Sequence, residues 1–182
     1  MINLNNNEEV YNMNVKAILL ALFSIALLTA CGTSSENADD VRALVDDYSA
    51  GDFTDDHQAS ITSSELIITN EDESKETYDL PDDEFFVSIA PFKNETHPCE
   101  IHSLTGCQGE LVDADFDMLI KNEAGEIVVD ETMNSGKNGF VDLWLPRDET
   151  YNVEIQYDEQ TVESEISTFE DDYTCITTMQ LS

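Results

Sequence analysis

Positive charge is scarce in this 182-residue chain, which has 7 Lys and Arg residues against 40 Asp and Glu residues and a formal net charge of -33. A protein that binds nucleic acid needs a basic surface to neutralise the phosphate backbone. The charge balance therefore excludes nucleic acid as a partner. The carboxylates are spread along the chain rather than gathered in one block, so we interpret them as a solvated acidic surface.

A long hydrophobic run is also absent. The apolar run over residues 17–28 has about 12 residues, which is fewer than the roughly 20 that a membrane-spanning helix needs. It follows Lys16 and ends in the segment Leu28-Thr29-Ala30-Cys31-Gly32. A basic residue before a short apolar run is typical of a secretory signal peptide, and small residues before a cysteine resemble a bacterial lipobox. The sequence predicts a lipoprotein signal peptide over residues 1–30 and lipidation of Cys31.

This leader implies an extracytoplasmic protein that is anchored to a membrane, in the periplasm or at the cell surface. The small polar residues 31–36 suit a tether between lipid and domain. Residues 37–50 place Val41, Leu44, Val45 and Tyr48 at helical spacing, with Gly51 just beyond the end. Strand-like runs over 65–69 and 75–80 flank a charged turn and predict a hairpin. We therefore expect a small helix and hairpin region over 37–80.

Short strand-like runs dominate the rest of the chain, residues 81–182. The alternation of Tyr151, Val153, Ile155 and Tyr157 with polar residues is typical of a strand with one buried face. Seven such runs separated by turn residues predict a mainly β fold with a β-sandwich-like C-terminal domain. The expected strands are 85–92, 110–120, 126–133, 139–145, 150–157, 161–169 and 173–181.

Cysteine and histidine are rare, with 4 and 3 residues respectively, yet several of them cluster. The segment 97–107 contains His97, Cys99, His102 and Cys107. If Cys31 carries lipid, three thiols remain. An extracytoplasmic chain normally pairs its cysteines, and three thiols can form at most one disulfide. The unpaired sulfur therefore needs another role.

The third of these thiols, Cys175, is far from the cluster in sequence. It lies on a predicted strand where Cys175, Thr177, Met179 and Leu181 share one face. Tertiary folding must bring Cys175 to the segment 97–107 if the three sulfurs act together. Met179 offers a thioether on the same face, although a methionine in a strand usually packs in a core.

Three interpretations of these residues remain open, namely a metal site, a disulfide and redox catalysis. Thiolates with an imidazole are soft ligands that suit Cu(I), and three cysteines with His97 or His102 would also make a closed tetrahedral zinc site. A disulfide between Cys99 and Cys107 could instead staple a loop of a cell-surface interaction module. Redox catalysis is the least favoured interpretation because the sequence has no C-x-x-C pair.

The chain from about residue 80 to the end resembles the CueP family of bacterial periplasmic copper-binding proteins. Several motifs carry this resemblance together. They are Phe85-Phe86-Val87-Ser88-Ile89-Ala90-Pro91, His97-Pro98-Cys99, residues 102–111 from His102 to Leu111, Gly139-Phe140-Val141, Trp144-Leu145-Pro146-Arg147-Asp148 and residues 174–181 from Thr174 to Leu181.

The resemblance implies that Cys99, Cys107 and Cys175 are copper thiolates, with His97 or His102 assisting. It also implies a role in copper tolerance, reduction of Cu(II) to Cu(I) at the thiols, and transfer of copper to an enzyme such as a superoxide dismutase. A homodimer is a further expectation of this resemblance. Because thiol reduction of Cu(II) consumes the thiols, we expect a copper-binding protein rather than an enzyme.

Overall fold

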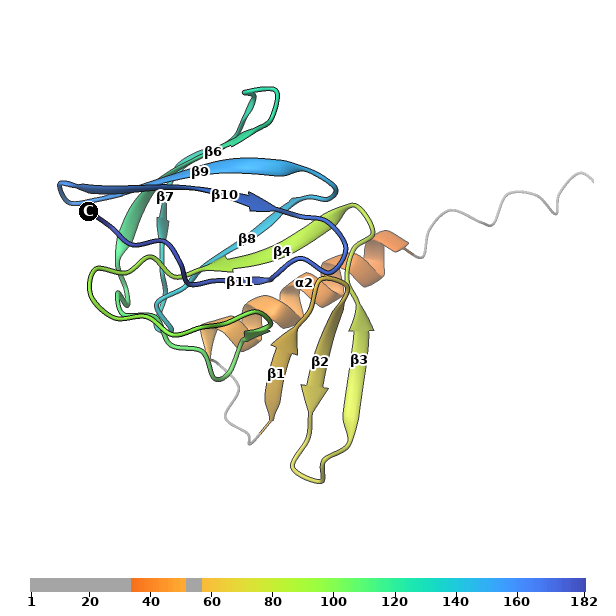
Figure 1. Cartoon of the computed structure of the whole chain (residues 1–182). Helices are drawn as coiled ribbons and strands as arrows, with labels where there is room; N and C mark the ends of the chain where they lie inside the picture. The colour runs from red at the N-terminus through yellow and green to blue at the C-terminus, as the bar shows by residue number, and fades with distance from the viewer. Residues whose placement is uncertain (1–33, 52–56) are drawn as a thin grey trace, which may run out of the picture. The chain divides into compact units, whose positions relative to one another are not determined.

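The computed structural model describes residues 34–51 and 57–182 (Figure 1). The expected signal peptide and Cys31 lie outside these described residues. The chain divides into the units Met1–Asn37 and Ala38–Ser182, and the contacts reported below lie within the second unit. No helix among the described residues is long and apolar enough to cross a bilayer.

The described part is mainly β, with one helix near its start, as the sequence predicts. The elements in chain order are α2 (Ser34–Ala50), β1 (Gln58–Ile61), β2 (Glu65–Thr69), β3 (Lys75–Asp79), β4 (Glu84–Ile89), β5 (His102–Ser103), β6 (Asp115–Asn122), β7 (Ile127–Asn134), β8 (Val141–Pro146), β9 (Thr150–Tyr157), β10 (Gln160–Ser167) and β11 (Cys175–Ile176).

Two sheets form the β-sandwich-like part. One has the strand order β10-β9-β6-β7 and the other has the order β11-β4-β8. Alternate side chains of both sheets point into a shared core. Its fully buried members include Phe85, Phe116, Met118, Leu145 and Tyr151. Burial of these apolar side chains is what holds the two sheets together.

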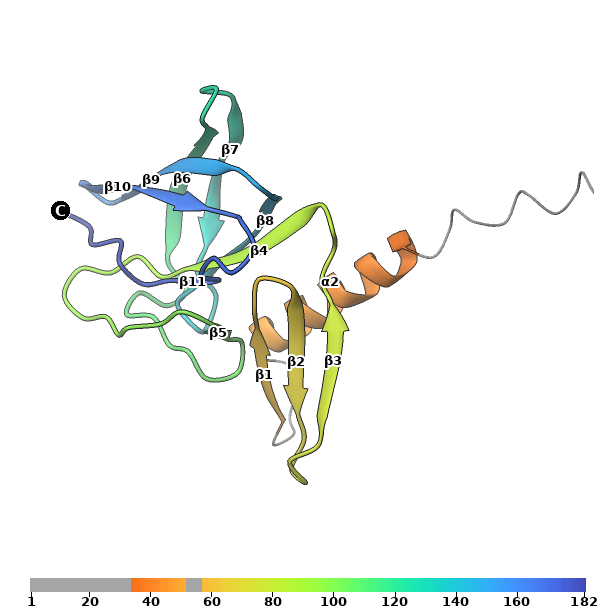
Figure 2. The same ribbon diagram turned by 45° about the vertical axis from the view of Figure 1, so that its right-hand side comes forward.

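A third sheet, with the order β3-β2-β1-β5, packs with helix α2 (Figure 2). Val41 and Val45 on the helix share a second core with Ile61 and Leu66 on the sheet. Strand β5 comes from the chain segment that carries the predicted site and pairs with β1, with Ile61 opposite His102. The N-terminal sheet therefore supports that segment directly.

Strand β4 lies between the two cores, and its alternation explains why it is buried on both faces. Phe85, Val87 and Ile89 point into the sandwich core, whereas Phe86 belongs to the core shared with α2. Ser88 is on the same face as Phe86 and has no exposed surface. A hydroxyl is thereby placed inside the protein on the face that looks toward β5.

Most predicted elements are present, with shifted ends. The hairpin and the strand 150–157 match β2, β3 and β9 closely. Helix α2 begins at Ser34, inside the expected tether, because no Pro or Gly interrupts the chain between Ser34 and Gly51. The expected strand 110–120 begins only at Asp115, after Asp113 adopts a positive φ of 50°.

The predicted strand 173–181 shortens to β11, followed by a bridge between Phe92 and Gln180. Its expected alternation still holds, because Cys175, Thr177, Met179 and Leu181 are all buried. Strands β1 and β5 were not predicted. Each has at most four residues, which is too few to show a periodic pattern in sequence.

Candidate metal centre

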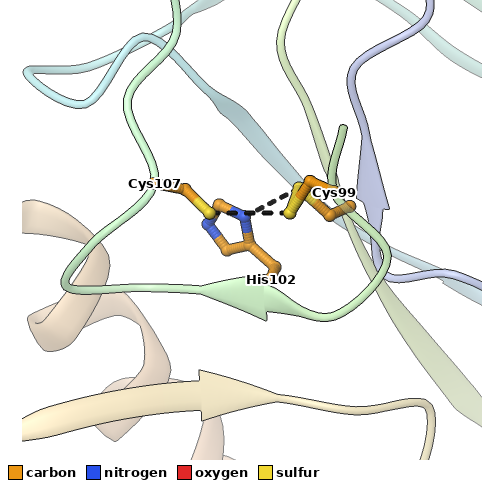
Figure 3. Close-up of side chains that lie close together, drawn as sticks. Cys99, His102 and Cys107 are labelled. Carbon is orange, nitrogen blue, oxygen red and sulfur yellow. Dashed lines mark hydrogen bonds between the residues drawn. A yellow bond between two sulfur atoms is a disulfide. The ribbon is translucent and has the colours of Figure 1, made fainter. Parts of the chain in front are cut away.

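Four side chains that could bind a metal ion converge where β5 and β11 meet the loops around them. Cys99 precedes β5, His102 lies on β5 and Cys107 follows it (Figure 3). Cys175 is the first residue of β11. One ligand atom from each residue lies within 4.8 Å of the others. His102 and Cys175 are buried, and Cys99 and Cys107 are partly exposed. The cluster is therefore buried on the side of His102 and Cys175 and accessible on the side of Cys99 and Cys107.

The three sulfurs are not equivalent. Cys99 and Cys175 form a disulfide across 76 residues, with Cα atoms 5.6 Å apart, and Cys107 is a free cysteine. The Sγ atom of Cys107 lies 3.6 Å from Sγ of Cys99. This pairing differs from the Cys99–Cys107 staple considered from the sequence. The pairing follows from a tertiary contact, because the N–H groups of Thr174 and Cys175 both donate to the Glu100 carbonyl and bring β11 beside Cys99.

His102 has no exposed surface and is held from several sides. Its Nδ1 lies 3.4 Å from Sγ of Cys175, and its Nε2 lies 3.3 Å from Oγ of Ser88. The ring packs against Phe140, with centroids 4.6 Å apart. The backbone N–H of His102 donates to the hydroxyl of Thr174 at 3.0 Å. The imidazole is thus fixed with one nitrogen toward the sulfurs.

Burial of the imidazole lowers the pKa of His102 to about 4, and repulsion by His97 contributes in the same direction. Desolvation disfavours the charged ring because the imidazolium loses its hydration. His102 is therefore neutral near neutral pH and keeps a lone pair for a metal ion. A neutral imidazole is the form that binds copper or zinc.

This pKa shift predicts that His102 destabilises the oxidised, metal-free protein in acid. Below pH ~6.5 the unfolded chain protonates this histidine, whereas the folded chain resists until pH ~4. Stability should fall as pH decreases through this window, by up to about 1.4 kcal/mol per pH unit from this residue. Urea unfolding of the wild type and of His102→Gln isolates the effect. Parallel pH profiles for the two proteins would contradict it.

One expected site residue, His97, lies apart from the cluster. The partly exposed ring of His97 lies 6.3 Å from the ring of Phe140, measured between centroids, and His97 is outside the four-residue group. Met179 is buried among the side chains of the sandwich core. The structure therefore brings together Cys99, His102, Cys107 and Cys175, and it leaves His97 at the edge.

A close approach of two backbones holds the Cys107 loop against the strand that follows Gly139. The N–H of Gly109 donates to the Asn138 carbonyl at 2.7 Å. A Cβ at Gly109 would fall on the Gly139 carbonyl group, with the carbonyl carbon at 2.8 Å. Gly139 also has a φ of +76°, which favours glycine. Next along the chain is Phe140, which packs on His102, so this contact connects the Cys107 loop to the histidine.

Gly109→Ala is therefore expected to destabilise the protein by about 3 kcal/mol, since inserting a methyl group into closely packed backbone forces the chain apart. Gly125→Ala is a suitable control. A Cβ at Gly125 meets open space, and only the positive φ of 79° opposes it. Chemical denaturation of both variants measures the difference. Equal destabilisation by the two substitutions would contradict the close contact.

Two polar residues near the cluster were missed in the sequence. Ser88 bridges His102 and Asp142, because its Oγ contacts His102 Nε2 and donates a hydrogen bond to the Asp142 carboxylate. Both residues interrupt apolar strands, with Asp142 lying between Val141 and Leu143. A polar residue inside a buried strand is unusual and could have indicated a site.

Three sulfurs and one neutral imidazole nitrogen form a soft donor set. Once the disulfide is reduced, three thiolates suit Cu(I), and all four atoms could also enclose Zn²⁺ tetrahedrally. No carboxylate belongs to the four-residue group, which disfavours the hard ions Mg²⁺ and Ca²⁺ at this position.

Comparisons with known proteins agree on one family. A family model described as "Periplasmic copper-binding protein CueP" matches residues 41–180. The solved structure described as "Crystal Structure of S.CueP" is 33% identical, with a TM-score of 0.73, and the match covers 92% of this chain and 97% of that chain. No curated protein matches this chain.

Proposed function

Because the chain belongs to the CueP family of periplasmic copper-binding proteins, we propose that it sequesters Cu(I) through the thiolates of Cys99, Cys107 and Cys175, with His102 as the assisting imidazole. The observation that carries this proposal is the convergence of these four ligand atoms within 4.8 Å. His97, at the accessible edge, is the candidate for first contact with incoming Cu(II).

The sulfur pairing supports reduction of Cu(II) at the same place. Two Cu(II) ions each accept one electron, and the thiolates of Cys99 and Cys175 supply both electrons as their S–S bond forms. The oxidised protein then retains one thiol, Cys107, next to the disulfide. Another round needs an external thiol reductant to return both electrons. The reaction is therefore stoichiometric in the protein alone, and we do not propose an enzyme.

The location that we propose is the outer side of a membrane, with a lipid at Cys31. The lipobox-like segment at residues 28–32 supports this proposal, and periplasmic copper binding is the description of the family. In that place the protein would contribute to copper tolerance and could pass Cu(I) to a copper enzyme such as a superoxide dismutase. Membrane fractionation of the full chain and of Cys31→Ser tests the anchor, since only the variant should be released.

Anaerobic titration of the reduced protein with Cu(I) and with Zn(II), each against a competing chelator, tests the metal. We expect one tightly held Cu(I) that excess Zn(II) does not displace. A preference for Zn(II) would favour the alternative, a structural zinc site made by the same four residues. The closed S₃N arrangement is the observation that keeps zinc as the second candidate.

The disulfide itself is compatible with a third reading, a cell-surface sandwich stapled between Cys99 and Cys175. Thiol counting on freshly purified, unreduced protein from its native compartment distinguishes the two roles. A constant single thiol, regardless of copper supply, is the result expected for a permanent staple. Three thiols in copper-poor cells would favour the metal site.

A further inference from the structure

The three-stranded sheet carries a row of polar side chains directly beneath His102. Strand pairing places Cys175 opposite Ser88 and Ser88 opposite Asp142. Residues opposite one another in a sheet point to the same face. Cys175, Ser88 and Asp142 therefore form one row across β11, β4 and β8. His102 reaches this row from β5, with Nδ1 at the Cys175 end and Nε2 at Ser88.

Ser88 can donate only one hydrogen bond within this row of side chains. A serine hydroxyl has one proton to donate and can accept further bonds, whereas an ionised carboxylate can only accept. The Ser88 hydroxyl donates to Oδ1 of Asp142. Its oxygen can then only accept a hydrogen bond from His102. The proton of the neutral ring must accordingly lie on Nε2.

We propose that Ser88 and Asp142 are positioning residues that select the Nε2–H tautomer of His102 and so direct the lone pair of Nδ1 toward the sulfurs. This inference deepens the proposed copper site and rests on it for its purpose. Neither residue contacts the metal in this proposal. Groups that orient a metal-binding histidine through its other nitrogen commonly change metal affinity by 10–100-fold.

The other tautomer is disfavoured by its hydrogen bonds. A proton on Nδ1 would point at a sulfur, which is a weak acceptor, and would leave two acceptors facing each other at Nε2 and Ser88. In the reduced protein the Cys175 thiol can instead donate to the free lone pair of Nδ1. The ring has little freedom to turn away, because Phe86 and Phe140 pack on it.

In this proposal Asp142 accepts the Ser88 hydrogen bond as an ionised carboxylate. Burial raises the pKa of its carboxyl and so disfavours this form, whereas the hydrogen bond from Ser88 lowers the pKa. Asp46 faces the same carboxylate from helix α2, while Arg42 on that helix contacts Glu84. Burying a carboxylate costs more free energy than burying an apolar side chain at the same position. The presence of Asp142 here therefore indicates a role for its charge.

Nitrogen NMR of the reduced, metal-free protein tests the tautomer directly. Histidine labelled with ¹⁵N is observed at about pH 8, where carboxyl groups are ionised, and His102 is assigned by comparison with His102→Gln. We expect a protonated Nε2 and an unprotonated Nδ1 in the wild type. Asp142→Asn and Ser88→Ala should each shift both ring nitrogens toward a mixture of tautomers.

Copper affinity provides the second measurement. Both variants should bind Cu(I) about tenfold more weakly than the wild type. Ser88→Thr, which keeps the hydroxyl, should retain the wild-type ring signals. Asp130→Asn removes the same charge from an exposed position on β7 and should change neither measurement. If Ser88→Ala does not fold, Asp142→Asn and Ser88→Thr still decide the matter.

A protonated Nδ1 in the wild type would overturn the proposal, as would unchanged ring signals in Asp142→Asn. Altered ring signals with unchanged Cu(I) affinity would also overturn it, because the tautomer would then have no effect on binding. Failure of the copper proposal is recognised separately. In that case Cys175→Ser and the wild type would bind Cu(I) equally, whatever the NMR spectra show.

Discussion

Cys175→Ser is expected to weaken Cu(I) binding by on the order of 10²–10³-fold. Structural zinc sites with four protein ligands contribute about 10–16 kcal/mol, which is roughly 2.5–4 kcal/mol for each ligand, and we take a similar value here. Cys175 is the most deeply buried of the three cysteines, and its Sγ lies 3.4 Å from Nδ1 of His102. A serine hydroxyl has nearly the same shape as a thiol but is a poor ligand for a soft ion.

The measurement is chelator competition under anaerobic conditions with the reduced protein. Thr178→Ser, at an exposed position three residues further on, controls for an unspecific change in this segment. Unfolding curves of Cys175→Ser establish that the variant is folded before its affinity is compared. A Cu(I) affinity within about threefold of the wild type would remove Cys175 from the site.

Reduction of the disulfide is expected to lower the free energy of unfolding of the metal-free protein by about 4 kcal/mol. The bond joins residues 76 apart in sequence, and closing so long a loop restricts the unfolded chain strongly. Reduction also removes the covalent link between Cys99 and β11, which pairs with β4 through a two-residue ladder. Urea unfolding of the oxidised and reduced forms measures the change.

Addition of Cu(I) should then restore stability to the reduced protein. A ligand that binds only the folded chain stabilises it by about 4 kcal/mol at a thousandfold excess over its Kd. Cys107→Ser is the matched control for the oxidised form. It removes the neighbouring thiol but keeps the Cys99–Cys175 bond, so its stability should remain that of the oxidised wild type. Identical unfolding midpoints for the oxidised and reduced proteins would contradict a stabilising bond.

Much of the fold follows from local pattern. Strand β9 was predicted with its bounds because Tyr151, Val153 and Ile155 alternate with exposed polar residues, and all three are buried. The helix was predicted for a similar reason, since Val41, Val45 and Tyr48 form one buried stripe. The short strands β1 and β5 could not be predicted. Their pairing depends on residues far apart in sequence and leaves no local period.

The candidate site was likewise predictable only where its residues leave a local signal in the sequence. Cysteine counting predicted the three sulfurs, and local density pointed to His97 and His102 alike, because these signals are present in the sequence itself. Only the fold separates the two histidines, since it places His102 in the cluster and His97 outside it. The sulfur pairing was not accessible, since it depends on how β11 docks beside Glu100. Ser88 and Asp142 were missed because their meaning comes from strand register. Opposite positions on β4 and β8 place them together, and neither residue forms a motif alone.

Copper K-edge X-ray absorption on the reduced protein with one equivalent of Cu(I) tests the central claim most directly. We expect Cu(I) bound by three sulfur atoms, with a nitrogen neighbour from His102 that disappears in His102→Gln. Loss of one sulfur neighbour is predicted for Cys175→Ser. A coordination shell dominated by oxygen and nitrogen, or one that is unchanged in Cys175→Ser, would contradict the three-thiolate site.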